Sequence, residues 1–262
     1  MTRSLSGQTI LVTGGSRGIG AAIVDHLLAE GARVVATYNS APGRLAQADP
    51  LAQAGGALSA LACDLGEPGA GRALWRAVRD AAGPIDAVVH NAAIMPSTPL
   101  EADQCDEATW AAHWQQVMQV NVQAVADLSR AAINDWLAAN GPEGGVRGRL
   151  VTLSSRAAAR GDTTDAIHYG ASKAALVSMM KSIARGYGPQ GIRAFTVAPG
   201  WVRTDMAAKA FAPGNEHMLA EIPTGSPCEP EEIAHMVAFL LSGRVDNATG
   251  STFDINGASY VR

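Results

Sequence analysis

The sequence predicts an α/β protein built on one parallel sheet with helices on both faces. Short apolar segments rich in β-branched residues alternate with longer helical patterns along the 262 residues. The candidate strands at residues 150–153 and 194–197 are mostly apolar throughout, which is typical of parallel strands buried between two helical layers. No linker, internal repeat or shift in composition divides the chain. We therefore expect a single domain over residues 1–262.

The composition is that of a globular protein. Hydrophobic residues make up 47% and charged residues 17%, and the formal net charge is −4, so nothing favours binding to nucleic acid or to an anionic membrane. Cys63, Cys105 and Cys228 lie far apart, form no metal-ligand spacing and fit a reducing compartment. The first seven residues are too polar for a signal peptide, and no apolar run approaches membrane-spanning length. We expect a cytoplasmic protein without a metal site.

The first predicted strand, residues 8–13, runs into a glycine turn and then a helix over about residues 20–30. Gly14, Gly18 and Gly20 follow the spacing G-x-x-x-G-x-G. Such a turn brings backbone N–H groups and the positive end of a helix up to a phosphate, and glycine is needed where a side chain would block the approach. Many strand-to-helix turns carry glycine for steric reasons alone, so the turn by itself leaves both explanations open.

The later elements continue the alternation. Helices are expected at about residues 69–82, 109–137, from Tyr169 onward and at 231–241, with a further helical stretch punctuated by Pro50. Residues 141–148, with four glycines and a proline, predict a surface loop or insertion. The remaining strands are expected at residues 33–38, 57–63, 85–90, 149–154, 193–198 and 251–255.

A doubly wound, Rossmann-type sheet binds ligands beyond the carboxyl ends of its strands. The polar residues expected at that edge are Ser16, Arg17, residues 38–40, Asp64, Asn91, Ser154, Ser155 and Thr204. Each has a plain structural alternative, since Asp64 and Asn91 are also the residue types that cap helices and hold turns. Their shared edge favours a site.

Tyr169 and Lys173 are four residues apart on a predicted helix and therefore share a face. An ordinary exposed helix face explains the pair equally well. The functional alternative is acid–base chemistry, because a nearby ammonium favours the tyrosinate of a side chain whose ordinary pKa is about 10. Ser155, expected at a strand end, is placed to polarise a carbonyl, or is only a loop serine.

Taken together, these motifs resemble those of the short-chain dehydrogenase/reductases over nearly the whole chain, in the order and close to the spacing of that family. The matching pieces are the turn from Thr13 to Gly20, Asp64-Leu65, Asn91-Ala92-Ala93, Asn121, Ser155, Tyr169-Gly170-Ala171-Ser172-Lys173, and the segment from Pro199 to Thr204. The stretch 222–234 resembles the 3-oxoacyl-(acyl-carrier-protein) reductases, although Ser226 and Cys228 depart from the residues commoner there.

The resemblance implies a catalytic role for four residues. Tyr169 would exchange a proton with the substrate oxygen, and Lys173 would lower the pKa of Tyr169 and hold the nicotinamide ribose. Ser155 would orient the substrate, with Ser154 as an alternative, and Asn121 would hold a water that relays protons. The four-residue Tyr–Lys spacing favours carbonyl–alcohol chemistry over that of enoyl reductases. His90, where many relatives have asparagine, is expected to be a structural difference.

The resemblance also implies a nicotinamide cofactor. NADP(H) is favoured over NAD(H), because the second strand ends in Thr37-Tyr38-Asn39-Ser40 without an acidic residue, while Arg17 is able to pair with a 2′-phosphate. The expected cofactor-binding residues are Gly14, Ser16, Arg17, Gly18, Ile19, Gly20, Asn39, Ser40, Asp64, Leu65, Asn91, Ala92, Ala93, Tyr169, Lys173, Pro199, Gly200, Val202 and Thr204.

The expected function is reduction of a small-molecule carbonyl, a 3-oxoacyl compound or another ketone, with NADPH. Residues 93–100, 156–168 and 201–218 are expected to wall the substrate pocket, with a lid-like segment at about 201–230. An alcohol or sugar dehydrogenase working in the oxidative direction is the enzymatic alternative, and a non-catalytic nucleotide sensor or scaffold is the alternative of another class. The family resemblance also implies a homo-oligomer, often a tetramer.

Overall fold

The computed structural model describes residues 4–51, 55–139, 145–214 and 216–261. Within them, eight parallel strands form one sheet in the order β3-β4-β2-β1-β5-β6-β7-β8. The order reverses at β1, which pairs with β2 on one side and β5 on the other, and this doubly wound arrangement confirms the predicted fold class. The strands are β1 Thr9–Val12, β2 Arg33–Tyr38, β3 Asp49–Pro50, β4 Leu58–Ala62, β5 Ala87–His90, β6 Gly148–Leu153, β7 Ile192–Pro199 and β8 Thr252–Ile255.

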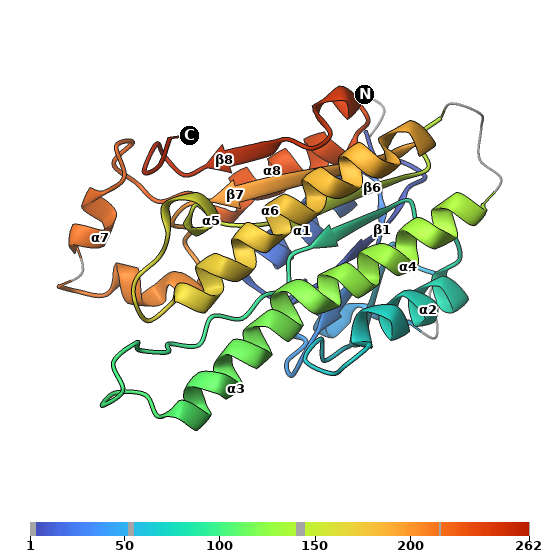
Figure 1. Ribbon diagram of the computed structural model, residues 1–262. Helices are drawn as coiled ribbons and strands as arrows, with labels where there is room; N and C mark the ends of the chain where they lie inside the picture. Colours follow the sequence, from blue (N-terminus) through green and yellow to red (C-terminus); the bar gives the residue numbers. More distant parts are fainter. Residues whose placement is uncertain (1–3, 52–54, 140–144, 215, 262) are drawn as a thin grey trace.

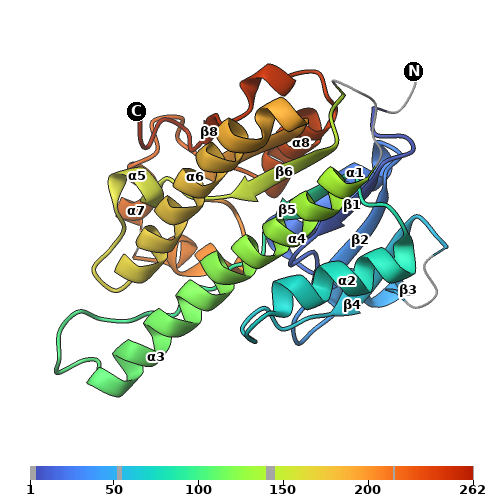
Figure 2. The ribbon, with the colours of Figure 1, turned by 45° about the vertical axis from the view of Figure 1, so that its right-hand side comes forward.

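Helices cover both faces of the sheet (Figures 1 and 2). On one face lie α2 (Ala70–Ala82), α4 (Ala124–Ala138) and α6 (Ile167–Tyr187), and on the other lie α1 (Gly18–Ala29) and α8 (Pro230–Leu241). Successive side chains of a strand feed opposite layers: Ile10 and Val12 pack on the α1 and α8 side, and Leu11 packs on the other. Two apolar cores therefore sandwich the sheet, which explains why its strands are apolar on both faces.

Between β2 and β4 the structure differs from the element that the sequence predicts. In the described part of the stretch expected to be helical there is a short 3₁₀ helix, η1 (Gly43–Gln47), before the two-residue edge strand β3, and no α-helix. Pro50 has no N–H to donate to a ladder, and it lies at the sheet edge where none is required. Most of the loop expected at residues 141–148 lies outside the described residues, and Gly148 already belongs to β6.

The helix expected over residues 109–137 is interrupted. It consists of α3 (Glu107–Met118) and α4, joined by a π-helical turn, η3 (Gln119–Gln123). The N–H of Ala124 donates to the carbonyl of Gln119, five residues earlier, which is the π pattern. Figure 1 shows α3 extending beyond the sheet at the end where the strands finish.

The remaining short helices include three at the carboxyl edge of the sheet, where Figure 1 shows two of them labelled, α5 (Ala157–Arg160) and α7 (Glu216–Ala220). The third is η5 (Asp205–Phe211), so η5 and α7 occupy the predicted lid segment. Away from this edge are η4 (Gly188–Gln190) and η6 (Asp246–Ala248).

Candidate active site

The glycine turn after β1 is a cradle that side chains would fill. Gly14 and Gly18 have φ of +69° and +53°, in the left-handed region that favours glycine. A Cβ on Gly20 would lie 2.0 Å from the carbonyl oxygen of Gly14. The helix α1 begins at Gly18 without a side-chain cap and with no acidic residue in its first turn. Its first N–H groups therefore suit an anionic group such as a cofactor pyrophosphate.

Asn91 and Thr13 hold this turn in place. The Asn91 side-chain amide donates to the carbonyls of Thr13 (3.0 Å) and Gly14 (2.9 Å). The Thr13 hydroxyl accepts the backbone N–H groups of Asn91 (3.1 Å) and Ala92 (3.2 Å). Thr13 was not among the predicted site residues, although its position between the strand and Gly14 is the signal that identifies it. These bonds fix Ala92 beside the turn.

The segment after β7 reaches the same turn. A Cβ on Gly18 would lie 3.2 Å from the Thr204 methyl group. Val202 forms a parallel bridge with Cys228, and the N–H of Gly200 donates to the carbonyl of Ile255 (2.9 Å). The Pro199 carbonyl accepts the N–H of Arg156 (2.9 Å), so this segment is also tied to the end of β6.

Other predicted cofactor residues take different positions around the edge. Arg17, Asn39 and Ser40 are exposed. Ser16 accepts the N–H of Arg44 on its carbonyl (2.9 Å). Asp64 accepts the N–H of Gly66 (2.8 Å), which is the turn-holding role that its residue type allows. Leu65 is buried in one apolar core, and Ile19 is partly buried against the other.

Ser155, Tyr169 and Lys173 come together between the end of β6 and the start of α6. The Ser155 hydroxyl contacts that of Tyr169, and the Lys173 Nζ lies 5.5 Å from the centroid of the Tyr169 ring. Lys173 is 3% exposed, and its Nζ donates to the carbonyl of Leu153 (2.8 Å). Ser154 instead donates its hydroxyl to the carbonyl of Lys173 (2.8 Å), and therefore anchors α6.

Burial dominates the electrostatics of this group. Desolvation and the nearby charge of Asp162 raise the pKa of Tyr169 to about 12, and the Ser155 hydroxyl offsets only part of this. Desolvation lowers the pKa of Lys173 to about 8. Lys173 is not among the groups that shift the Tyr169 pKa, so its expected lowering of that pKa stays a prediction, and at neutral pH Tyr169 is a protonated phenol.

Asn121 lies in the π turn and links two elements of the site. Its side-chain oxygen accepts the N–H of Ile94 (2.9 Å), and its amide donates to the carbonyl of Ile94 and the hydroxyl of Ser172 (both 3.0 Å). Ser172 in turn donates to the carbonyl of Tyr169 (2.7 Å). The Asn121 side chain therefore joins the loop after β5 to the turn of α6 that carries Tyr169.

The three segments expected to wall a substrate pocket do meet. Thr98 donates its N–H to the carbonyl of Asp165 (2.8 Å), which joins the first segment to the second. Arg156 stacks its guanidinium over the Trp201 ring at 5.2 Å and pairs with Glu221, which joins the second to the third. His90, in contrast, is buried beside the Ser129 hydroxyl (Nε2–Oγ 3.0 Å) with its pKa lowered to about 3, as befits the structural role expected of it.

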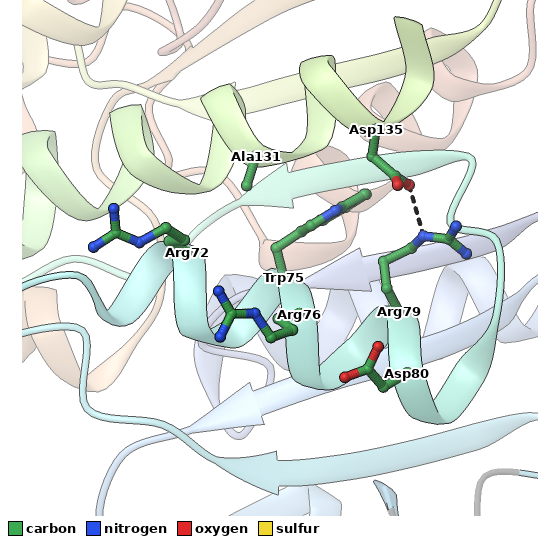
Figure 3. Close-up of a pocket in the computed structure, with 7 residues that line it drawn as sticks. All are labelled: Arg72, Trp75, Arg76, Arg79, Asp80, Ala131 and Asp135. Carbon is green, nitrogen blue, oxygen red and sulfur yellow. Dashed lines mark ion pairs between the residues drawn. The ribbon is translucent and has the colours of Figure 1, made fainter. Parts of the chain in front are cut away.

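A hollow on the helical face lies apart from this site. Figure 3 shows it between α2 and α4, where Arg79 Nε pairs with Asp135 Oδ2 at 2.6 Å. None of the predicted site residues lines it.

Among the described residues, no three His, Cys, Asp or Glu side chains gather as metal ligands would. No helix in the described part of the chain has the length and apolarity needed to cross a bilayer.

Comparisons with known proteins show which sequences this chain resembles. The family described as enoyl-(acyl carrier protein) reductase matches residues 14–258. The chain is 33% identical over 258 residues to the 3-oxoacyl-(acyl-carrier-protein) reductase FabG of Vibrio cholerae, covering 98% of this chain and 99% of that protein.

Two solved structures have the same fold. A dehydrogenase/reductase from Sinorhizobium meliloti is 36% identical, with a TM-score of 0.84 over 99% of this chain and 98% of that one. A short chain dehydrogenase from Burkholderia cenocepacia in complex with NADP is 32% identical, with a TM-score of 0.82 over 98% and 99%. By its motifs, its fold and these relatives, the chain belongs to the short-chain dehydrogenase/reductase family of NAD(P)-dependent oxidoreductases.

Proposed function

We propose that this enzyme uses NADPH to reduce a ketone, of the 3-oxoacyl or a related type, to the alcohol, with Tyr169 as the proton donor. The observation that carries the proposal is the grouping of Tyr169, Ser155 and Lys173 at the edge of the sheet that also holds the glycine cradle. Similarity to FabG of Vibrio cholerae supports the 3-oxoacyl class. The four-residue Tyr–Lys spacing supports carbonyl rather than enoyl reduction.

Bound at the cradle, NADPH would supply the hydride. The side chains of this chain handle the substrate oxygen. The Tyr169 phenol is protonated at neutral pH and would donate its proton to the substrate oxygen as that oxygen gains negative charge, because an alkoxide is a stronger base than a tyrosinate. The Ser155 hydroxyl polarises the same oxygen. The buried ammonium of Lys173 stabilises the tyrosinate that remains, because burial strengthens their attraction.

In reduction Tyr169 would donate its proton to the substrate oxygen, and in oxidation the same side chain would accept one. Asn121 is proposed to hold a water that relays protons through Lys173. Its backbone would hold this water, because its side chain already bonds Ile94 and Ser172.

Arg17 is proposed to select NADPH over NADH. It is exposed at the N-cap of α1, and the exposed Asn39 and Ser40 follow β2 without an acidic residue that would hold a free ribose hydroxyl. Titration with both cofactors is expected to show tighter binding of NADPH. An Arg17→Ala variant should narrow the preference by about tenfold, which corresponds to about 1.4 kcal/mol, and equal affinities in the native protein would refute the assignment.

The test of the reaction is a screen of ketones and 3-oxoacyl thioesters, followed by NADPH absorbance, together with alcohols and NADP⁺ to establish direction. Tyr169→Phe should lower kcat by roughly 10²–10⁴ while leaving the Kd for NADPH within about threefold, because the acid–base step alone is lost. Tyr187→Phe is the matched control, since Tyr187 lies exposed at the far end of the same helix. A Tyr169→Phe enzyme with native activity would refute the mechanism.

We also propose one catalytic domain in which η5 and α7 act as a lid over the substrate, and a homo-oligomeric assembly. The Arg156–Glu221 and Arg160–Glu221 pairs support the lid, because they attach its far end to α5. Light scattering at fixed protein concentration measures the assembly.

A further inference from the structure

A buried cluster of two histidines and a threonine joins three elements next to Tyr169. Thr98 lies in the loop after β5, His113 on α3 and His168 at the start of α6. The Thr98 hydroxyl oxygen is 2.9 Å from His113 Nδ1 and 3.1 Å from His168 Nε2. Thr98 and His168 are each 1% exposed. The proposed mechanism uses none of the three.

Further bonds tie the loop after β5 to the segment that leads into α6. Thr98 donates its N–H to the carbonyl of Asp165 (2.8 Å), and Ser97 donates its hydroxyl to the Asp165 carboxylate (2.7 Å). The Trp114 ring lies 5.9 Å from that of His168 and closes the α3 side. The residue that follows His168 in the chain is Tyr169, so these contacts fix the backbone from which the phenol projects.

The hydroxyl of Thr98 has one proton and accepts through two lone pairs. With both imidazoles neutral, its two histidine contacts are satisfied when one ring nitrogen donates to the oxygen and the other accepts from it, or when both donate and the hydroxyl proton turns to the carbonyl of Pro96 (3.3 Å). Charging both rings would place two cations on either side of one oxygen. The cluster therefore disfavours the state in which both rings are charged.

We propose that His168 is a positioning residue for the reaction, holding Tyr169 in place through Thr98 and His113 while its own imidazole is neutral. This rests on the proposed role of Tyr169. Burial and the neighbouring His113 lower the pKa of His168, and Asp165 and the hydrogen bonds to the backbone of Pro96 and Ala166 act in the opposite direction. His168 is thus protonated only on acidification. There we expect the hydrogen bonds that join Thr98, His113 and His168, here called the clamp, to weaken.

The first test replaces Thr98 by valine, which keeps the branched shape and removes the hydroxyl. The expected result is a fall of about tenfold in kcat with the Kd for NADPH within twofold, because the phenol is displaced and the distant cradle is not. Thr98→Ser, which restores a hydroxyl, should recover kcat to within about threefold of the native value. A Thr98→Val enzyme with native kcat would overturn the proposal.

The second test uses the pH profile of kcat. Replacing His113 by asparagine keeps a donor and removes the charge that lowers the pKa of His168, so the acid limb is expected to move to higher pH. His235→Asn, on the far face of the sheet beside His26, is the matched control and should leave the limb in place. If the acid limb of the kcat profile is unchanged or moves to lower pH in His113→Asn, the positioning role of His168 is contradicted.

A third readout separates this proposal from that of the function. Long-range ¹H–¹⁵N spectra of the histidine side chains report tautomer and titration without substrate. In Thr98→Val the tautomers of both His113 and His168 should change, and in His113→Asn the His168 titration should move to higher pH. Unchanged spectra overturn the positioning role of His168 whether or not a substrate is found. Changed spectra together with a native kcat in Tyr169→Phe overturn the proposed function alone.

Discussion

His90 should make the protein lose stability on mild acidification. Its imidazole is 3% exposed within the core between β5 and α4, and burial lowers its pKa to about 3 from an ordinary 6.5. Between these values the unfolded chain binds a proton that the folded chain excludes. Stability therefore falls as the pH drops through 6.5 towards 3.

The magnitude follows from these two pKa values. At pH 5 the unfolded histidine is almost fully charged and the folded one almost fully neutral, which costs about 2 kcal/mol of unfolding free energy. At pH 7 the same difference is only about 0.2 kcal/mol. The native protein should thus lose roughly 1.8 kcal/mol through this residue between pH 7 and pH 5, a large part of a typical margin of about 5–15 kcal/mol.

The assay is urea unfolding at both pH values with native protein and His90→Asn, at one protein concentration so that any assembly contributes equally. Asparagine does not titrate, and its side-chain oxygen is able to accept the Ser129 hydroxyl. The pH-dependent loss should be smaller in the variant by about 2 kcal/mol. Other titrating groups cancel in this double difference. If both proteins lose the same free energy, the argument that burial holds His90 neutral is wrong.

Two further predictions concern the site. Gly20→Ala should weaken NADPH binding and lower stability, because its Cβ would lie 2.0 Å from the Gly14 carbonyl oxygen. Gly186→Ala, in open space on α6, is the control and should be neutral or stabilising by up to about 1 kcal/mol. NADPH titration and thermal melts of both variants check this. For Lys173, the folded pKa of about 8 lies below the ordinary 10.5, so between these values the folded state binds fewer protons and stability rises with pH. Relative to Lys173→Met, native protein should gain about 2 kcal/mol between pH 7 and 9.5 in urea unfolding, and a flat difference would show that the ammonium is not desolvated.

Much of the fold could be predicted because apolar runs that end at glycine, proline or asparagine mark strands directly. β2 was predicted to the residue, and the other long strands to within two. The two-residue β3 was missed because it exists only through pairing with Ser59 and Ala60. The π turn was missed because one additional residue in a helical pattern hardly alters its periodicity.

The candidate site was predictable as a set of residue types but not as a set of contacts. The order of motifs along the chain indicated Ser155, Tyr169 and Lys173. It did not indicate that Ser154 anchors α6 through the Lys173 carbonyl, or that burial raises the pKa of Tyr169. Such details depend on which groups surround a side chain, and that information is distributed over distant segments. The clamp of Thr98, His113 and His168 is of the same kind, because its members are far apart in sequence.

The π turn makes chain length itself a constraint. It inserts one residue between α3 and α4, so every side chain after Gln123 is rotated by about 100° from where a regular helix would place it. Val117 of α3 and Leu128 of α4 are both buried, and the Asn121 side chain in the turn between them accepts the N–H of Ile94 in the loop after β5. Substitutions in the turn leave this phase intact, whereas loss of a single residue would turn half of the helix away from its core. Variation in this region should therefore take the form of exchanged residues and very rarely of gained or lost ones.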